Sequence, residues 1–204
     1  MPRNADNENH WHAIAQRYAL EPGPIKLENG YLGRMSQAVQ AQYLEHVAFI
    51  NRSNSLHVRQ HFERGENEAI RRQLAGLIDV DPAAVAFTRN ATEALQSLIR
   101  NYNRLQPGDQ VLISDLEYDT VKGAMRWLAG YRGVEVIELS HTHPASFDSL
   151  VQTYRDAFVQ YPRLKLMALT HVTHRTGLVM PVAAIAQAAR EQGIDVILDG
   201  AHAL

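Results

Sequence analysis

The sequence predicts an α/β fold in which a mostly parallel sheet is flanked by helices. Short apolar runs alternate with longer amphipathic runs from about residue 84 onward, which is the pattern of repeated strand–helix units. Turn signals separate these runs, namely Pro107-Gly108-Asp109 and Gln192-Gly193. Each turn joins the end of an expected helix to an expected strand, so the strands are expected to run in the same direction.

The elements are assigned in chain order from these signals. Residues 1–35 are expected to form an arm, because Glu21-Pro22-Gly23-Pro24 interrupts any helix. Apolar residues at helical spacing predict helices over residues 36–50 and 66–78. In the alternating region the expected strands are 84–87, 110–114, 134–139, 165–172 and 195–198. The expected helices of that region are 92–104, 119–130, 146–160 and 182–192.

The chain is expected to have one soft boundary. Residues 1–65 form the N-terminal arm and helices, and residues 66–204 form a partial large domain. The last expected strand, 195–198, is followed by no helix within the sequence, so we expect it to lack cover on its faces. This favours a fragment, a truncated product or part of a longer protein.

Composition indicates a folded globular protein, because 46% of the residues are hydrophobic and 21% are charged. A formal net charge of −2 gives no electrostatic reason to expect nucleic acid or an anionic membrane as a partner. The absence of cysteine excludes a disulfide framework, a Cys-based metal site and a Cys nucleophile in this sequence. Residues 1–10 lack the features of a signal peptide, and no apolar run approaches the roughly 20 residues of a membrane helix. We therefore expect a soluble, cytoplasmic protein.

The segment 87–95, Phe-Thr-Arg-Asn-Ala-Thr-Glu-Ala-Leu, follows an expected strand and opens a helix. The free backbone N–H groups of Ala91 and Thr92, with the positive end of the helix dipole, suit a phosphate group. The hydroxyl group of Thr92 adds a further donor. An ordinary helix cap is the alternative, in which Asn90 or Thr92 satisfies free amides and Glu93 favours the dipole.

The end of the sequence places a carboxylate after an apolar strand. Asp199 ends the run Val196-Ile197-Leu198 and is followed by Gly200-Ala201-His202. In open α/β sheets the carboxyl ends of parallel strands are where ligands bind, which favours a ligand role for Asp199. A strand-ending Asp that only caps the following turn is the alternative.

Two further segments follow expected strands. Asp115-Leu116-Glu117-Tyr118-Asp119 follows strand 110–114, and His171-Val172-Thr173-His174-Arg175-Thr176-Gly177 closes strand 165–172. His171, His174 and His202 suggest zinc, but no Cys or carboxylate accompanies them at metal spacing, so no metal is expected. His141-Thr142-His143-Pro144 is expected to be a solvated turn.

Together these segments resemble the class V aminotransferase family of fold-type I pyridoxal-phosphate enzymes, over about residues 25–204. Leu27-Glu28-Asn29-Gly30-Tyr31-Leu32-Gly33 is similar to the opening segment of isopenicillin-N-epimerase-like members. The resemblance implies the family's large domain in truncated form, pyridoxal 5'-phosphate as cofactor and a small-molecule amino acid as substrate. It also implies that the full-length parent is a homodimer.

The resemblance also implies roles for individual residues. Tyr118 would stack on the pyridine ring, and Asp199 would keep the ring nitrogen protonated; these two are the expected catalytic residues. His174 and His202 would lie beside the phenolic oxygen of the cofactor. The full set of expected cofactor-binding residues is Ala91, Thr92, Tyr118, Thr173, His174, Asp199 and His202.

The resemblance implies chemistry at the α carbon of an amino acid, of an epimerase-like or aminotransferase-like kind. Desulfurase members usually have Glu-His-His where this chain has Glu117-Tyr118-Asp119, and this difference, with Asp-Gly-Ala-His, favours the epimerase-like or aminotransferase-like interpretation. The alternatives are a cysteine desulfurase or selenocysteine lyase-like member, and a non-catalytic truncated fragment. A nucleotide-binding α/β protein is a third alternative, but it lacks both G-x-G-x-x-G and a Walker loop.

The family's Schiff-base lysine lies beyond the strand-ending Asp. The lysines of this chain are Lys26, Lys122 and Lys165, and none matches that position. We therefore expect the longer parent to be an enzyme and this chain alone to be inactive.

Overall fold

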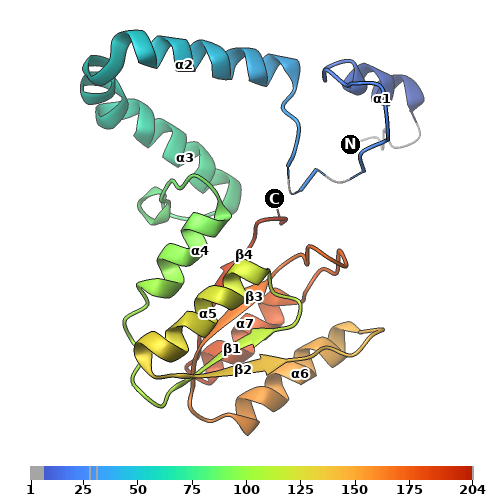
Figure 1. Cartoon of the computed structure of the whole chain (residues 1–204), viewed down its shortest axis with the longest axis vertical. Coiled ribbons are helices and arrows are strands. Elements are labelled where there is room, and N and C mark those ends of the chain that lie inside the picture. The colour runs from blue at the N-terminus through green and yellow to red at the C-terminus, as the bar shows by residue number, and fades with distance from the viewer. Residues whose placement is uncertain (1–6, 28, 31, 204) are drawn as a thin grey trace. The chain divides into compact units, whose positions relative to one another are not determined.

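The computed structural model describes residues 7–27, 29–30 and 32–203 and has an α/β fold (Figure 1). Its internal contacts divide the chain into two compact units, Met1–Phe87 and Thr88–Leu204. The division lies beyond helix α3 (Asn67–Ile78) and the 3-10 helix η3 (Pro82–Ala84), which contact each other within the first unit, whereas the sequence predicts a boundary at 65/66. Glu28 and Tyr31 of the segment 27–33, and the final residue of the sequence, lie outside the described residues.

The first unit is helical. Its elements are α1 (Glu8–Ala15), α2 (Gln37–His57), the π-helix η2 (Val58–Glu66), α3 (Asn67–Ile78) and the 3-10 helix η3 (Pro82–Ala84). The helices expected over 36–50 and 66–78 are confirmed, and α2 continues to His57. The structure adds α1 to the expected arm, with the side chain of Asn7 accepting a hydrogen bond from the N–H of His10 at 3.2 Å.

The strand expected over residues 84–87 is wrong. Asp81 accepts a hydrogen bond from the N–H of Ala83 at 2.8 Å and starts η3. Residues 85–87 then run as extended chain, with no ladder partner among the described residues. A short apolar run after Asp-Pro therefore forms a turn and a connection here, because the Asp side chain satisfies the backbone locally.

The second unit holds a four-stranded sheet. Its strands are β1 (Gln110–Ser114), β2 (Glu135–Leu139), β3 (Leu164–Thr170) and β4 (Asp195–Asp199). They lie in the order β2-β1-β3-β4, and all neighbouring pairs are parallel. The expected parallel sheet is confirmed. Strand β3 ends at Thr170, because Val172 forms an isolated antiparallel bridge with Val179 in the turn that follows.

Four helices pack on this sheet, of which the first precedes β1 and the other three connect successive strands. They are α4 (Ala91–Arg100), α5 (Asp119–Arg132), α6 (Phe147–Gln160) and α7 (Val182–Glu191). Helix α4 is shorter than expected, since the side-chain amide of Asn101 donates to the carbonyl of Ser97 at 2.9 Å and closes the last turn. Helix α5 ends where Gly133 adopts φ 68°, a left-handed conformation that glycine tolerates.

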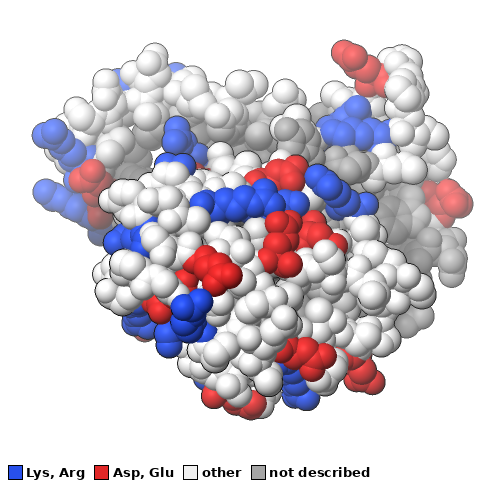
Figure 2. Space-filling view, turned by 60° about the horizontal axis from the view of Figure 1, so that its bottom comes forward, with Lys and Arg blue, Asp and Glu red and all other residues white. Residues whose placement is uncertain are grey.

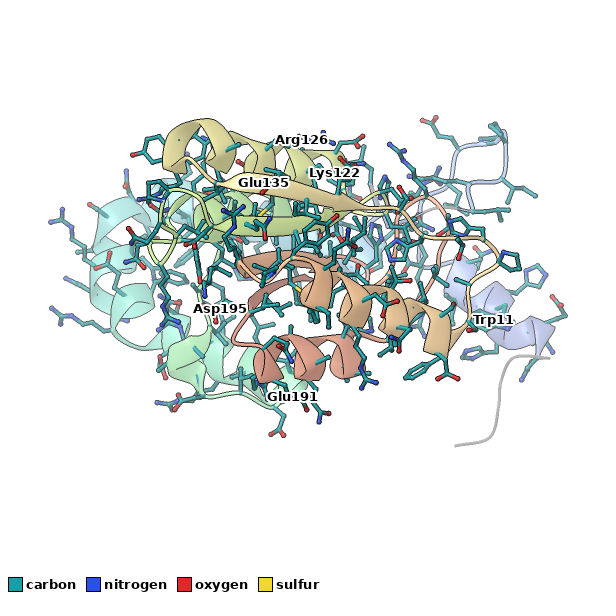
Figure 3. All side chains as sticks on the ribbon, turned by 90° about the horizontal axis from the view of Figure 1, so that it is seen from below. Trp11, Lys122, Arg126, Glu135, Glu191 and Asp195 are labelled. Atoms are coloured by element: carbon teal, nitrogen blue, oxygen red, sulfur yellow. The ribbon has the colours of Figure 1, made fainter. Side chains whose placement is uncertain are left out.

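The core has two layers, one on each face of the sheet. Alternate strand residues such as Val111, Ile113 and Leu166 pack with helices α4 and α5. Their neighbours, such as Leu112 and Met167, pack with helices α6 and α7 on the opposite face. Figure 3 shows α5 on one side of the sheet and α6 and α7 on the other. This near-continuous burial is typical of parallel strands.

Strand β4 is partly covered, so the expectation of uncovered faces is only partly right. Helices α4 and α7 both contact it. Ile197 packs against the cluster on the α4 side, and Val196 packs against the cluster on the α7 side. Leu198 is 48% exposed.

The surface carries mixed charge on the face drawn in Figure 2, where basic and acidic side chains lie side by side. No helix in the described ranges combines the length and the apolar character needed to cross a bilayer.

Candidate functional site

The carboxyl ends of the strands meet at one edge of the sheet in the second unit. Ser114 ends β1, Thr170 ends β3 and Asp199 ends β4, and the register pairs Thr170 with Asp199. In parallel α/β sheets the loops beyond this edge form the usual ligand site. The expected site residues Tyr118, Thr173, His174 and His202 all lie in those loops or at their ends.

The start of helix α4 offers free donors. The side chain of Asn90 accepts from the N–H of Glu93 at 2.8 Å, so it caps the third residue of the helix. The carboxylate of Glu93 accepts from the N–H and the guanidinium of Arg89 at 2.8 and 3.1 Å, and these contacts hold the pKa of Glu93 below its usual range. Within the described chain no acceptor takes the N–H groups of Ala91 and Thr92, and both residues are exposed.

The direction of α4 follows from a contact at its other end. The hydroxyl group of Tyr102, just beyond the helix, donates to Asp195 Oδ2 at 2.6 Å, and Asp195 begins strand β4. Helix α4 contacts β4, and the residue just beyond its end lies at the start of the strand, which indicates that the helix and the strand run in opposite directions. The start of α4 therefore lies toward the edge of the sheet where Asp199 ends β4.

A second contact ties the start of α4 to the start of α5. The side-chain amide of Gln96 donates to the carbonyl of Thr120 at 2.9 Å. Thr92 lies one turn before Gln96, on the same face of α4. The free N–H groups of α4 thus share this region with Tyr118, the residue that precedes α5.

Asp199 is buried, with 7% of its surface exposed. Its Oδ1 accepts from the N–H of Ala201 at 3.0 Å, and its backbone carbonyl accepts from the N–H of His171 at 2.9 Å. The turn-capping contact of the alternative interpretation is therefore present. It uses one oxygen, and among the described residues no hydrogen bond engages Oδ2.

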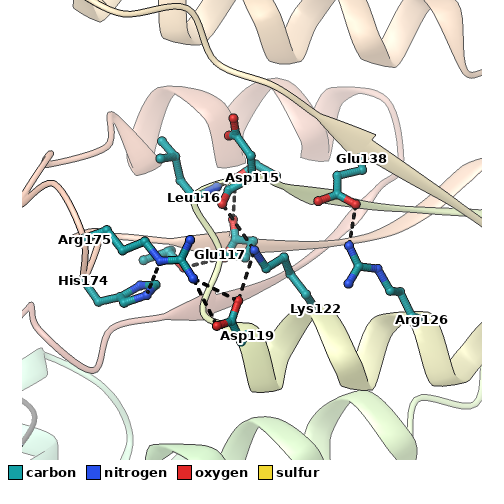
Figure 4. Close-up of polar contacts among 11 residues, drawn as sticks. Asp115, Leu116, Glu117, Asp119, Lys122, Arg126, Glu138, His174 and Arg175 are labelled. Atoms are coloured by element: carbon teal, nitrogen blue, oxygen red, sulfur yellow. Dashed lines mark hydrogen bonds and ion pairs between the residues drawn. The ribbon is translucent and has the colours of Figure 1, made fainter.

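Tyr118 and His174 form an aromatic pair at the same edge. Their ring centroids lie 4.9 Å apart at an interplanar angle of 78°, an edge-to-face contact. Arg175 donates from Nε to His174 Nε2 at 3.2 Å and pairs with Asp119 at 3.1 Å (Figure 4). Burial, followed by the charge of Arg175, lowers the pKa of His174, which favours its neutral form near pH 7.

Thr173 and His202 occupy different surroundings. Thr173 is buried, and its hydroxyl group lies 2.5 Å from that of Thr176 and accepts from the N–H of Leu178 at 3.1 Å. Its side chain thus shapes the turn that carries His174. His202 is exposed in the turn after β4 and acts electrostatically on His174.

Glu117 is a site residue that the sequence reasoning did not single out. Its side chain is fully enclosed, and its carboxyl group accepts from Ser114 Oγ at 3.1 Å and from the hydroxyl group of Thr170. Burial is the largest cause that raises the pKa of Glu117, and the charge of Asp199 adds to it. The signal in the sequence is an acid three residues after the strand 110–114, in a segment that also contains Asp115 and Asp119.

The solvated turn expected at 141–144 is wrong for His141. Its side chain is 1% exposed, and its Nδ1 lies 3.0 Å from Asp115 Oδ1. Its ring also lies 5.6 Å from that of Tyr154, which is fully buried in α6. Two histidines that closely precede a proline look hydrophilic in sequence. Asp115 supplies a hydrogen-bond partner for His141, which allows this side chain to be buried.

The lysines are engaged or remote from the aromatic pair. Lys122 Nζ lies 3.3 Å from Asp119 Oδ1 and donates to the carbonyl of Asp115 at 3.4 Å (Figure 4). Lys26 belongs to the first unit, where it donates to the carbonyl of Leu32 at 2.6 Å. Lys165 is exposed within β3. In the part of the chain that the structure describes, no group of three or more His, Asp or Glu side chains is arranged to hold a metal ion.

Comparison with known proteins decides the family. The family model described as aminotransferase class-V matches residues 32–204. The chain belongs to the class V aminotransferase family. A probable cysteine desulfurase of Vibrio cholerae serotype O1 is 32% identical over 82% of this chain and 41% of its own length. An isopenicillin N epimerase of Streptomyces clavuligerus is 33% identical over 65% of this chain and 33% of its own length.

Solved structures support the class V fold. A mutant of the enzyme C-DES with glycine covalently linked to its pyridoxal-phosphate cofactor covers all of this chain and 50% of its own, with a TM-score of 0.76 and 19% identity. The cysteine desulfurase CsdA of Escherichia coli covers 94% of this chain and 48% of its own, with a TM-score of 0.74 and 22% identity. The chain thus spans half or less of the length of these relatives.

Membership of this family indicates pyridoxal phosphate as the cofactor. The residues present fit such a group. The free N–H groups of Ala91 and Thr92 at a helix start suit a phosphate, and Oδ2 of Asp199 is a carboxylate oxygen without a protein partner among the described residues. Both features lie in one compact unit.

Proposed function

We propose that this chain supplies the cofactor-binding half of an enzyme that transforms an amino acid at its α carbon, by epimerase-like or aminotransferase-like chemistry. The observation that carries the proposal is the direction of α4, which brings its free N–H groups toward the edge that holds Asp199. A phosphate donor site and a carboxylate at one edge are the two anchors that a phosphorylated pyridine needs.

The chemistry comes from the cofactor, whose protonated ring draws electrons from a bond at the α carbon. The carboxylate of Asp199 would hold the proton at the ring nitrogen. Ala91 and Thr92 would bind the phosphate through backbone N–H groups, and Tyr118 would stack on the ring. His174, in its neutral form, and His202 would contact the phenolic oxygen.

A cysteine desulfurase-like or selenocysteine lyase-like enzyme is the second candidate. The identity to the Vibrio cholerae relative favours it, since that match covers more of this chain than the match to the epimerase. The residue Tyr118 and the run Asp199-Gly200-Ala201-His202 favour the first candidate. Exchange of the α hydrogen of amino acids with deuterated water, measured beside sulfide release from L-cysteine, separates the two.

The role of Asp199 is tested in the full-length enzyme. We expect Asp199→Ala to reduce turnover far more than cofactor retention, because the phosphate contacts remain while the ring loses the partner of its proton. Turnover and cofactor content are measured on the same samples, with the exposed Asp148→Ala as the matched control. Near-normal turnover in Asp199→Ala would exclude the proposed role.

The lysines are tested in the chain of residues 1–204. We expect no reducible covalent adduct with pyridoxal phosphate, because Lys122 is held by Asp119, Lys26 is engaged by the carbonyl of Leu32 and Lys165 is exposed on β3. Borohydride reduction followed by peptide mass spectrometry measures this. A stoichiometric adduct on one of these lysines contradicts the expectation and identifies a substitute for the family's lysine.

Two properties of the whole protein are part of the same proposal. We propose that it is a homodimer and that it acts in the cytoplasm. Light scattering coupled to size exclusion measures the first, and fractionation of cells that express the full-length protein measures the second. A monomer at all concentrations contradicts the proposed homodimer. Recovery of the protein outside the cytoplasm contradicts the proposed location.

A further inference from the structure

Glu117 joins the two central strands at the edge where the site lies. One carboxyl oxygen accepts from Ser114 Oγ, at the end of β1, and the other accepts from the hydroxyl group of Thr170, at the end of β3. Thr170 is the register partner of Asp199. The carboxyl group of Glu117 is therefore fixed beside the strand end that presents Asp199, and its side chain is enclosed.

No cation balances this carboxyl group among the residues that the structure describes. Lys122, the nearby base of helix α5, points to Asp119 and the carbonyl of Asp115 (Figure 4). From β4 the facing titratable group is Asp199, and from α6 it is Tyr154. Burial raises the pKa of Tyr154 well above its usual value, so this phenol stays neutral.

The remaining charge near Glu117 is also negative or already paired. Asp115, two residues earlier on the same loop, pairs with His141 at 3.0 Å. Two carboxylates that share a poorly hydrated region cannot both ionise at low cost, and this raises the pKa of the more deeply buried one. Glu117 is the more deeply buried of the two, since its exposed fraction is 1% against 7% for Asp199.

We propose that Glu117 is a positioning residue for the cofactor, whose enclosed carboxyl group ties the ends of β1 and β3 together and is coupled to the carboxyl group of Asp199 at the same edge. The link to the cofactor rests on the function proposed above, whereas the coupling between the two carboxyl groups does not. When Glu117 carries its proton, its O–H group donates to the hydroxyl group of one partner while its other oxygen accepts from the second, and Glu117 then adds no second charge beside Asp199.

The coupling is measured by ¹³C NMR titration of the glutamate carboxyl groups in the full chain. The resonance of Glu117 is assigned by its loss in Glu117→Gln. We expect its midpoint above the ordinary glutamate value of about 4.3, and we expect Asp199→Asn to move the midpoint down. Asp148→Asn, an exposed acid in the first turn of α6, is the control that leaves it unchanged. A midpoint at or below the ordinary value, or one indifferent to Asp199→Asn, overturns the proposal.

A second measurement needs no substitution at Asp199. An acid whose pKa is raised by folding stabilises the protein fully below its unfolded pKa, and this contribution is lost as the pH rises through the folded pKa. Glu117→Gln carries no such loss. The denaturant midpoint of Glu117→Gln minus that of the wild type should therefore increase as the pH rises above about 4.3. Glu138→Gln, which removes an exposed partner of Arg126, is the control without this rise. A difference between Glu117→Gln and the wild type that is flat with pH overturns the proposal.

A ligand titration separates this inference from the proposed function. Pyridoxal 5'-phosphate, or pyridoxine 5'-phosphate, which lacks the aldehyde, places a pyridinium at Asp199 and should lower the midpoint of Glu117. Inorganic phosphate at the start of α4 should leave it unchanged. If Asp199→Asn shifts Glu117 but neither pyridine compound does, the proposed function fails and the carboxyl pair stands. If the pyridine compounds bind while Asp199→Asn has no effect on Glu117, the inference fails and the proposed function stands.

Discussion

The two units of the chain differ in how their apolar side chains are used. In Thr88–Leu204 two buried clusters enclose the sheet, one on each face. Among the described residues of Met1–Phe87, Ala75 is the only buried hydrophobic side chain. Helix α2 carries Val39, Tyr43 and Val47 at helical spacing, yet each is more than half exposed. The spacing alone thus predicts a helix, but it does not tell what the helix packs against.

The packing of the second unit is what fixes the candidate site residues described above. A side chain at the edge of a sheet is fixed only if the strands below it are fixed, and packing on both faces supplies that constraint. Asp199, Tyr118 and the start of α4 all belong to Thr88–Leu204.

The largest expected contrast between the units is in core substitutions. Met167→Ala removes a fully buried side chain from the centre of β3 and should lower the free energy of unfolding by about 2–5 kcal/mol. Val47→Ala, at a position that is 51% exposed on α2, should change it by less than about 0.5 kcal/mol. Urea unfolding followed by circular dichroism measures both. Equal losses would show that α2 buries this face in solution.

The next contrast compares one side-chain hydrogen bond from each unit. Tyr102→Phe removes the bond to Asp195 that fixes the end of α4 to β4, and we expect a loss of about 1–2 kcal/mol. Lys26→Met removes an exposed bond to the carbonyl of Leu32 in the first unit and should cost no more than a few tenths. Unfolding at pH 7 compares the two variants. An equally large loss of stability in Lys26→Met would contradict the expected difference between the two units.

The hydrogen bond between Tyr102 and Asp195 also makes stability depend on pH. Burial, followed by the hydrogen bond to Asp195, raises the pKa of Tyr102 to about 12. Because the folded pKa exceeds the unfolded pKa of about 10, the stabilising effect is complete below about pH 10 and is lost as the pH rises toward 12. Ultraviolet titration should therefore lose a late phenolate component in Tyr102→Phe. Loss of a component that titrates near pH 10 instead would mean that Tyr102 is free in solution.

Most of the parallel sheet was predictable, because buried strands read as apolar runs between turn signals. The strands 110–114 and 195–198 and the helix starts near 92, 119 and 182 follow directly from these patterns. Residues 84–87 were mispredicted because no strand among the described residues pairs with them, and pairing is not encoded in a short run. Apolar periodicity likewise gives no sign of the π-helix η2.

The residues expected to bind the cofactor could be predicted from the sequence, whereas the buried polar residues near them could not. Ala91 and Asp199 stand where strand–turn–helix logic places a phosphate and a carboxylate. Glu117 and His141 are polar in sequence and buried in the structure, because Thr170 and Asp115, distant in the chain, supply their partners. Such pairings depend on strand order, which a single sequence does not state.

The smallest expected contrast compares two helix caps of the same residue type. Asn90 accepts from the N–H of Glu93 at 2.8 Å and starts α4, whose Leu95 and Ile99 are buried. Asn7 accepts from the N–H of His10 at 3.2 Å and starts α1, which has no buried residue. A lost cap lowers global stability only when the helix is coupled to the core, so Asn90→Ala should cost about 1 kcal/mol and Asn7→Ala close to none. Thermal unfolding compares the variants, and Asn90→Ser, which retains a cap, should recover most of the loss. Equal losses in the two alanine variants would show that α1 unfolds together with the sheet, and the contrast between the units would then be one of side-chain burial alone.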